Sequence, residues 1–138
     1  SMKRGGMTAA WVSRVSWDPP LVMVAMAPSR FTLELIKEYG AFVINIVGRS
    51  LEKEAYGIFG SASGRNVDKF AVSKVSYFKA SSITAPVLAD ATAALECKLE
   101  KLVEAGDHVI VIGRVVKAWK LKDEKPLVFY RVGSAELK

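Results

Sequence analysis

Hydrophobic and polar positions alternate most regularly in the last third of the chain. From Ala93 to Glu100 apolar residues take every second position, and His108–Lys120 is a long, mostly apolar run that follows the turn signal Gly106-Asp107. A repeat of two predicts strands with one buried face, so we expect two long antiparallel strands joined by a tight turn. Gly113, inside the second run, predicts a bulge or a barrel kink.

The first part of the chain changes from a strand period to a helix period. Thr8–Ser16 alternates in part and Leu21–Ala27 is continuously apolar, so both are predicted to be strands, the second covered on both faces. From Phe31 to Tyr39 apolar residues recur with helical spacing. Ser29 is the expected N-cap of this helix, and Gly40 is the residue expected to end it.

Weaker patterns complete the predicted order of elements. We expect a strand, a helix, a loop, a short helical turn and a last strand at Ala41–Val47, Ser50–Phe59, Gly60–Arg65, Val67–Ala71 and Leu127–Val132, with an irregular connection over 74–88. Six or seven mainly antiparallel strands and a few helices predict a mainly β fold. The expected form is an antiparallel barrel, closed or partly closed, with helices packed outside, because closure removes exposed sheet edges.

Composition narrows the class of protein. The chain has 138 residues, a length typical of one domain over 1–138, and 51% hydrophobic with 25% charged residues excludes disorder. No apolar run approaches the roughly 18–20 residues of a membrane helix, and no signal peptide is evident, so we expect a soluble cytoplasmic protein with no membrane partner. One cysteine and one histidine exclude a disulfide framework and the common metal sites. Cys97 is expected to be a buried, inert thiol.

The charge balance favours an anionic ligand. Lysine and arginine number 20 against 14 acidic residues, a net charge of +6, which suits phosphates, nucleotides or nucleic acid. The basic residues form no blocks, so a phosphorylated small molecule is the better fit. A basic barrel for single-stranded nucleic acid stays an alternative, with aromatic side chains that would stack bases at Trp11, Trp17, Trp119 and Tyr130.

The start of the predicted helix carries the first candidate site. Ser29, Arg30 and Thr32 surround it, so unpaired N–H groups, the helix dipole, two hydroxyls and a guanidinium converge on one point, as a phosphate site requires. The alternative is that Ser29 only caps the helix and Arg30 is solvated. The small residues of Thr8–Trp11 would let a flat ring approach the backbone.

Two further candidates are less specific. The small-residue loop 60–65 and the following Asp68-Lys69-Phe70 would wrap an anionic tail or serve only as a loop; they lack the end of a P-loop motif. His108, beside a turn, is either structural or a titratable donor at the mouth of a pocket. A single histidine permits no Ser-His-Asp or Cys-His arrangement, so an enzyme built on this chain would depend on a bound cofactor.

Taken in order, these residues resemble the flavin reductase-like family, which includes the flavoredoxins. The resemblance runs from about residue 6 to about residue 130 and implies an FMN-binding split barrel, usually a homodimer, that binds FMN or FAD and passes hydride from NADH or NADPH to flavin. It rests on Gly6-Met7-Thr8-Ala9-Ala10-Trp11-Val12-Ser13, Asp18-Pro19-Pro20-Leu21-Val22, Pro28-Ser29-Arg30 with Thr32, Phe59-Gly60-Ser61, Ser63-Gly64-Arg65, Asp68-Lys69-Phe70, Ala85-Pro86-Val87-Leu88, Leu95-Glu96-Cys97 and Gly106-Asp107-His108.

The resemblance also implies roles for individual residues. The isoalloxazine ring would be lined by Thr8, Ala9, Ala10 and Trp11. The phosphate would be held at the helix start by Ser29, Arg30 and Thr32. The loop would close over the ribityl-phosphate side with Ser63, Arg65 and Lys69. His108 would lie near the nicotinamide or the ring edge and is the catalytic candidate. A non-catalytic FMN-binding electron carrier is the alternative within the same family.

The chain departs from the family pattern at both ends. Only residues 1–6 precede the Met-Thr-Ala segment, where relatives usually have a strand and a turn, so the first barrel strand is expected to be missing or truncated. Val132-Gly133-Ser134-Ala135 replaces the aromatic-rich tail that the family leads us to expect.

Overall fold

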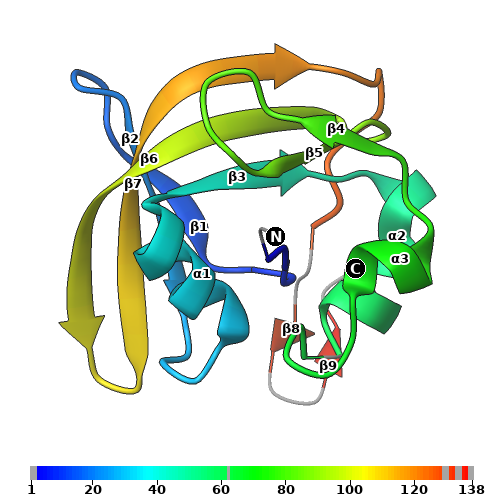
Figure 1. Cartoon of the computed structure of the whole chain (residues 1–138), viewed down its shortest axis with the longest axis horizontal. Helices are drawn as coiled ribbons and strands as arrows, with labels where there is room; N and C mark the ends of the chain where they lie inside the picture. The colour runs from blue at the N-terminus through cyan, green and yellow to red at the C-terminus, as the bar shows by residue number, and fades with distance from the viewer. Residues whose placement is uncertain (1–2, 62, 129–130, 133–134, 137–138) are drawn as a thin grey trace.

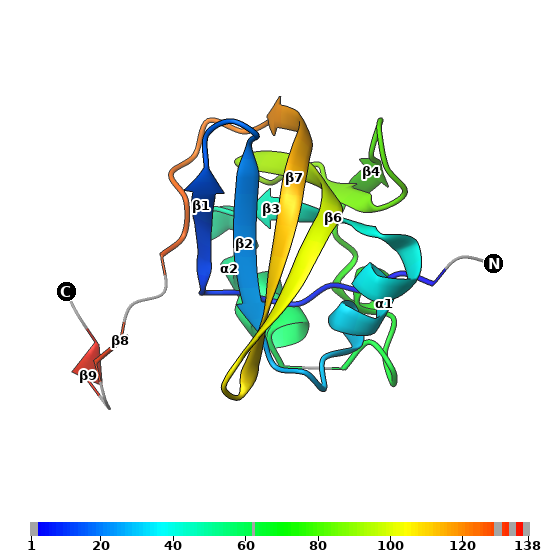
Figure 2. The ribbon, with the colours of Figure 1, turned by 90° about the vertical axis from the view of Figure 1, so that its left-hand side faces the viewer.

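A curled, five-stranded antiparallel sheet forms the body of the protein (Figures 1 and 2). The computed structural model describes residues 3–61, 63–128, 131–132 and 135–136. The sheet has the order β1-β2-β7-β6-β3, with strands β1 (Val12–Ser16), β2 (Leu21–Met26), β7 (His108–Lys120), β6 (Ala93–Ala105) and β3 (Ala41–Ile46). Within the described residues β1 and β3 each pair on one side only, so the sheet curls without closing. The fold is the antiparallel split barrel that the sequence predicted.

The long hairpin of β6 and β7 confirms the clearest prediction from the sequence. The two strands pair continuously from Ala93 opposite Lys120 to Ala105 opposite His108, with register shifts near Cys97 and near Leu99. Gly113 lies opposite Leu99, beside the second shift. A Cβ atom at Gly113 would lie 2.4 Å from the Phe42 ring. The glycine therefore allows the aromatic ring to pack directly against the strand.

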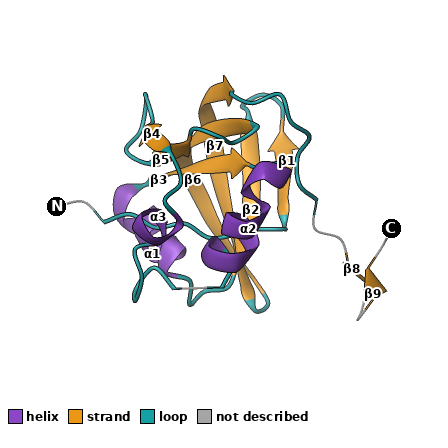
Figure 3. Ribbon diagram, turned by 90° about the vertical axis from the view of Figure 1, so that its right-hand side faces the viewer, coloured by secondary structure: helices purple, strands orange, loops and turns teal. Residues whose placement is uncertain are grey.

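Strand β2 is covered on one face rather than two, so that prediction is wrong. Val22, Val24 and Met26 are buried, whereas the residues between them are only half-buried. The helices lie on one side of the sheet (Figure 3), and the buried residues of β2 pack with residues of α1. The core cluster on that side comprises Val22, Val24, Met26, Leu33, Ile36, Phe42, Cys97, Val109 and Val111.

Helix α1 (Phe31–Tyr39) follows β2 and ends as predicted. Gly40 has φ of 65° and its N–H donates to the carbonyl of Ile36 at 2.8 Å, because a left-handed residue closes the last turn. The prediction that Ser29 is the N-cap is wrong. A turn in which the N–H of Arg30 donates to the carbonyl of Ala27 moves the helix start one residue on, so Arg30 takes the N-cap position without a side-chain cap.

The segment of residues 3–9, which we call the strap, crosses the open side of the barrel (Figures 1 and 3). The prediction of a strand from Thr8 is wrong for residues 8–11, since β1 begins at Val12. The reason is tertiary: the N–H of Thr8 donates to the carbonyl of Phe59 at 3.3 Å, and its hydroxyl donates to the carbonyl of Ala55. These contacts draw the chain off the sheet.

Short helices line the other side of the strap. The predicted helix over 50–59 is confirmed but irregular, a 3-10 turn η1 (Arg49–Leu51) leading through α2 (Glu52–Glu54) into a π-helical segment η2 (Ala55–Phe59). The predicted helical turn near residue 70 is α3 (Lys69–Ser73). The connection over 74–88 contains the strands β4 (Tyr77–Lys79) and β5 (Pro86–Leu88), which pair with each other.

The predicted strand Leu127–Val132 is wrong at its start and confirmed at its end, where Arg131–Val132 form a strand. Residues 127–128 are not in a strand, because the N–H of Leu127 donates to the carbonyl of Val47 at 2.7 Å. Residues 129–130 lie outside the described part, and β8 (Arg131–Val132) pairs with β9 (Ala135–Glu136). No helix among the described residues has the length and apolar character to cross a membrane.

Candidate functional site

The predicted loop and the predicted helix start meet at one end of the barrel, shown at the bottom of Figure 2. The guanidinium of Arg65 donates to the carbonyl of Ser29 at 3.2 Å and lies 5.3 Å from the centroid of the Phe31 ring. A Cβ atom at Gly64 would lie 2.6 Å from the same ring. The loop therefore packs directly on the first turn of α1, as the site expected from the sequence requires.

Lys69 and Arg30 bring two positive charges to this end of the molecule. Lys69 is only 5% exposed, and its ammonium donates to the carbonyl oxygens of Gly6 at 2.8 Å and Phe59 at 3.0 Å. Burial lowers the pKa of Lys69, and the nearby charge of Arg30 lowers it further. Among the described residues no carboxylate lies within ion-pair distance of either cation. An anion held between them would relieve this repulsion.

The start of α1 offers backbone donors to the same region. The N-cap position makes no side-chain hydrogen bond, and the N–H groups of Phe31 and Thr32 make no backbone hydrogen bond in the described part of the chain. A helix start with free N–H groups and a positive dipole end binds anions. Both hydroxyl residues, Ser29 and Thr32, lie close to these donors in the sequence. Their environments differ, because Thr32 is half-buried and Ser29 is exposed.

Ser63 and Arg65 are already engaged within the protein. The hydroxyl of Ser63 accepts the N–H of Arg65 at 3.2 Å, and the guanidinium of Arg65 forms an ion pair with Glu34. These contacts hold the loop against α1. Of the predicted cationic site residues, Arg30 and Lys69 are therefore the pair whose charge is left unbalanced by the described residues.

The segment from Thr8 to Trp11 presents a short stretch of free backbone. Thr8 is held by η2, and the carbonyl of Trp11 accepts the N–H of Ala25 at 3.0 Å. Between these anchors the backbone groups of Ala9 and Ala10 make no hydrogen bond to other described residues. The segment therefore combines two small side chains with an unpaired backbone, as the ring site expected from the sequence requires.

Trp11 and His108 lie side by side although they are 97 positions apart in the sequence. Their ring centroids are 4.5 Å apart at an interplanar angle of 42°, and Trp11 is 59% exposed. The Nδ1 atom of His108 lies 2.7 Å from a carboxylate oxygen of Asp107, and this hydrogen bond, together with the histidine charge, lowers the pKa of Asp107. The structure thus brings the predicted ring-lining residue and the catalytic candidate together.

A cavity of about 410 Å³ runs along the strap. Thr8, Ala9 and Thr32 line it together with apolar side chains of β2, α1 and β3. The cavity therefore adjoins the predicted flavin segment and the helix start at the same time.

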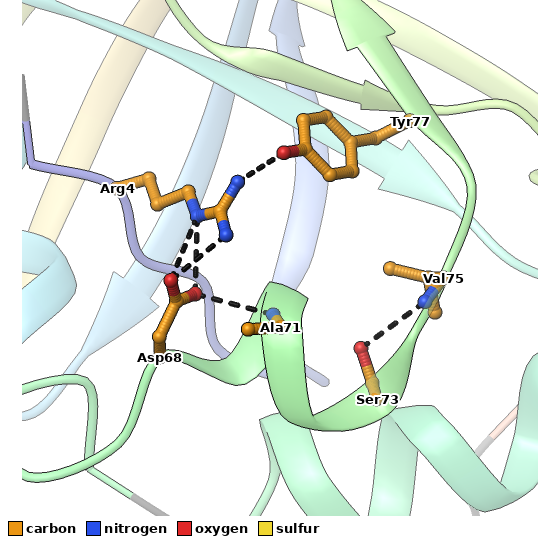
Figure 4. A network of polar contacts seen from close by, with 6 residues as sticks. All are labelled: Arg4, Asp68, Ala71, Ser73, Val75 and Tyr77. Atoms are coloured by element: carbon orange, nitrogen blue, oxygen red, sulfur yellow. Dashed lines mark hydrogen bonds and ion pairs between the residues drawn. The ribbon is translucent and has the colours of Figure 1, made fainter.

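One group at the site was missed by the analysis of the sequence. Arg4 donates from Nε and Nη2 to the carboxylate of Asp68 at 3.0 and 2.8 Å, and from Nη1 to the hydroxyl of Tyr77 (Figure 4). An aspartate just before a short helical pattern is an N-cap signal, so Asp68 was detectable. Nothing in the sequence relates Arg4 to a residue 64 positions away.

Other predicted residues fall into structural roles. Cys97 is fully buried, as predicted, and burial raises the pKa of its thiol to about 12. Trp119 donates to buried Glu96 at 2.6 Å, while Trp11 and Trp17 flank opposite ends of β1. Tyr130 lies outside the described residues. The three described tryptophans do not share one stacking surface.

Comparison with known proteins gives one family for the whole chain. Residues 1–138 match the flavin reductase like domain. A protein of Moorella thermoacetica named as a high molecular weight rubredoxin is 38% identical over 125 residues, which cover 90% of this chain and 53% of that protein. The chain thus spans about half the length of this relative, and 51% of a relative from Aeropyrum pernix.

Solved structures agree with the fold. An FMN-binding protein of Thermus thermophilus, solved with bound 1-cyclohex-2-enone, is 34% identical with a TM-score of 0.74, covering 81% of this chain and 60% of its own. An NADH:FAD oxidoreductase of Streptomyces globisporus, solved in complex with NAD and FAD fragments, is 30% identical with a TM-score of 0.78, covering 89% and 74%.

Proposed function

Since this chain belongs to the flavin reductase-like family, we propose that it binds FMN and transfers hydride from NADH or NADPH to flavin. The observation that carries the proposal is the pair of unneutralised cations, Arg30 and Lys69, beside the uncapped start of α1. A terminal phosphate supplies the charge that this arrangement lacks. FAD is the alternative flavin, as in the Streptomyces globisporus neighbour.

The phosphate site is assigned to the end of the barrel where α1 begins. Arg30 would form charge-assisted hydrogen bonds to the phosphate, with Ser29 and Thr32 as hydroxyl donors and the first N–H groups of α1 as backbone donors. Lys69 would contribute its charge from below the strap. Ser63 and Arg65 would close over the ribityl chain from the loop, which already packs on α1.

The ring site is assigned to residues 8–11. Ala9 and Ala10 would donate and accept hydrogen bonds through their free backbone groups, while Thr8 and Trp11 fix the ends of the segment. Bound FMN would supply the hydride acceptor, chemistry that the side chains of this protein lack. The protein's own contribution is to position the ring and to present donors to the charge that hydride transfer creates.

His108 and Trp11 are the residues proposed to meet the nicotinamide. Their rings lie 4.5 Å apart beside the ring segment, and Asp107 holds the Nδ1 side of the histidine. The opposite nitrogen of His108 is left to contact the nicotinamide or the flavin edge.

An absorption spectrum recorded after adding FMN and desalting tests the proposal. We expect a yellow protein, quenching of FMN fluorescence on binding, and oxidation of NADH or NADPH faster than with free FMN alone. A colourless protein that leaves FMN fluorescence unchanged would sink the proposal.

A non-catalytic FMN carrier is the second candidate. The Thermus thermophilus neighbour is named for FMN binding rather than for a reductase activity, which favours this reading. A protein that stays yellow after desalting but does not speed NADH oxidation over free FMN would identify it as a carrier. The homodimer and the cytoplasmic location remain predictions, and sedimentation of the FMN-loaded protein checks the first.

A further inference from the structure

The strap is fastened to the helical side of the barrel at both of its ends. At its start, Arg4 places its guanidinium against three groups at once: the carboxylate of Asp68, the hydroxyl of Tyr77 and, at 5.5 Å from the ring centroid, the face of Phe70. At its end, Thr8 is held on η2 by its N–H and its hydroxyl. Figure 4 shows the Arg4 end with Asp68 and Tyr77.

Asp68 links the strap to the buried cation of the proposed phosphate site. Its carboxylate accepts Arg4 and also the N–H of Ala71 at 3.3 Å, so it caps the start of α3. The next residue is Lys69, whose ammonium returns to the strap at the carbonyl of Gly6. A closed ring of contacts therefore joins Arg4, Asp68, Lys69 and Gly6. Within this ring a shift of the strap would move Lys69, and a shift of Lys69 would move the strap.

The strap has little room to move while this ring is closed. A Cβ atom at Gly5 would lie 2.8 Å from Leu35 of α1, and one at Gly6 would lie 3.0 Å from Phe59 of η2. The backbone is thus threaded between two helical walls. Three residues further on, the same backbone becomes Ala9 and Ala10, the proposed support of the flavin ring.

We propose that Arg4 and Asp68 are a positioning pair for the flavin site. The inference rests on the proposed function and extends it to two residues outside the segments assigned to the phosphate, the ring and the nicotinamide. Their ion pair fixes the strap, and the strap fixes the ring segment and Lys69 together. The effect of losing the pair is therefore a loss of affinity for the ring as well as for the phosphate.

The chemistry of the pair suits positioning better than stabilisation. The side chains of Arg4 and Asp68 are 34% and 48% exposed, and an exposed ion pair contributes little to global stability. The planar guanidinium, however, fixes direction through several N–H groups at once, which lysine cannot do. We therefore expect flavin affinity to respond more strongly than the unfolding temperature.

The test compares Asp68→Asn, Arg4→Gln and Arg4→Lys with the wild-type chain. Asparagine is also a good N-cap, so Asp68→Asn keeps the start of α3 and removes the charged pair. Arg49→Gln is the matched control, because Arg49 is an exposed arginine with only a 3.9 Å contact to Glu52. FMN and riboflavin are titrated separately by fluorescence quenching, and the visible band of each bound flavin is recorded.

We expect each of the three variants to weaken FMN and riboflavin alike, by about fivefold, with a shifted visible band and little change in thermal unfolding. The double variant Arg4→Gln/Asp68→Asn should be no weaker than Asp68→Asn alone, since both remove one interaction. Arg49→Gln should bind as the wild-type protein does.

Three outcomes would overturn the inference. Variants that bind both flavins like the wild-type chain show that the strap needs no such pair. A loss confined to FMN shows a direct electrostatic effect on the phosphate, and full recovery in Arg4→Lys shows that charge alone matters. If the wild-type protein binds no flavin, the proposed function fails by itself; hydrogen exchange of the strap amides, expected to quicken in Asp68→Asn, then decides the inference separately.

Discussion

Two charged side chains are buried in the described part of the molecule, and they differ in how completely they are neutralised. Glu96, near the start of β6, is fully buried, and Lys69, at the start of α3, is 5% exposed. Burying a charge is costly unless hydrogen bonds or an opposite charge compensate. The two residues therefore show a buried charge with charge-compensating donors and a buried charge with neutral partners only.

Glu96 has a complete set of donors. Its carboxylate accepts the N–H groups of Ser81 at 3.0 Å and Ser82 at 2.7 Å, the hydroxyl of Ser81, and the indole N–H of Trp119 at 2.6 Å. Burial alone would raise the pKa of Glu96, but these hydrogen bonds outweigh it and hold the pKa below its usual range. Glu96 thus holds the loop before β5 against the sheet, and its carboxylate is fully hydrogen-bonded within the protein.

The ammonium of Lys69 donates only to neutral carbonyls, and the like charge of Arg30 lowers its pKa in addition to burial. The dipoles of these two carbonyls compensate only part of the cost of burying its positive charge. This difference supports the assignment of Lys69, rather than Glu96, to the proposed phosphate site. The four predictions below test it, from the largest expected effect to the smallest.

Replacing Glu96 by alanine should remove the hydrogen-bond network around this carboxylate and destabilise the fold. Glu96→Ala leaves the indole N–H of half-buried Trp119 and the N–H groups of Ser81 and Ser82 without their acceptor, so we expect the free energy of unfolding to fall by about 2–3 kcal/mol. Urea denaturation measures the loss. Glu100→Ala, at an exposed position of the same strand, is the control and should change stability by less than about 0.5 kcal/mol. A similar small change in Glu96→Ala would contradict the structural role.

Replacing Arg30 by alanine should act on the proposed phosphate site and leave the fold intact. Arg30→Ala is expected to weaken FMN by tens of fold, equivalent to about 2 kcal/mol for charge-assisted hydrogen bonds, and to leave riboflavin unchanged. Stability without flavin should hold or rise slightly, since a like charge near Lys69 is removed. Fluorescence titrations with both flavins measure the ratio, with Arg49→Ala as the control. Equal losses for FMN and riboflavin would refute the phosphate assignment.

The pH dependence of stability should reveal the contribution of the Glu96 carboxylate as well. Because the pKa of Glu96 is lower in the folded state, its contribution is complete above the unfolded pKa of about 4.3 and is lost as pH falls through the folded pKa. The wild-type chain should therefore lose more stability on acidification than Glu96→Gln. Urea midpoints from pH 7 down to acid pH measure the difference, and parallel curves for the two proteins would contradict it.

The smallest effect concerns the strap that carries Lys69's partner carbonyl. In Gly6→Ala the new methyl group lies 3.0 Å from the Phe59 ring, so we expect about 1 kcal/mol of destabilisation from overpacking and a modest loss of affinity for both flavins. Gly57→Ala in η2 meets no atom within 4 Å and should be neutral. Phe59→Leu in the Gly6→Ala background should recover affinity; no recovery would show that the strap is insensitive to this contact.

Much of the fold could be predicted because its signals are local. The alternation in β6, the turn at Gly106 and the helix ending at Gly40 each follow from a few neighbouring residues. The failures lie where distant segments compete for backbone groups. Thr8 leaves its strand to bind η2, and Leu127 pairs with the carbonyl of Val47, and neither choice has a signal within its own segment.

The candidate site divides in the same way. The sequence placed hydroxyls and a guanidinium at the start of a helix, and the structure keeps Arg30 and Thr32 there. It did not foresee that Lys69 would be buried under the strap, that Arg65 would pair with Glu34, or that Arg4 would reach Asp68. Those contacts join residues from separate elements, so only the packed chain defines them.

By itself the sequence determined which segments are strands and helices, and which residues carry charge suited to a phosphate, because periodicity and side-chain chemistry are properties of neighbouring positions. The tertiary structure decided which of those charges are satisfied. Glu96 receives four hydrogen bonds from two other segments, whereas Lys69 donates only to neutral carbonyls and has its pKa lowered further by the charge of Arg30. Whether a buried charge is compensated depends on partners that are distant in the sequence and come close only after folding.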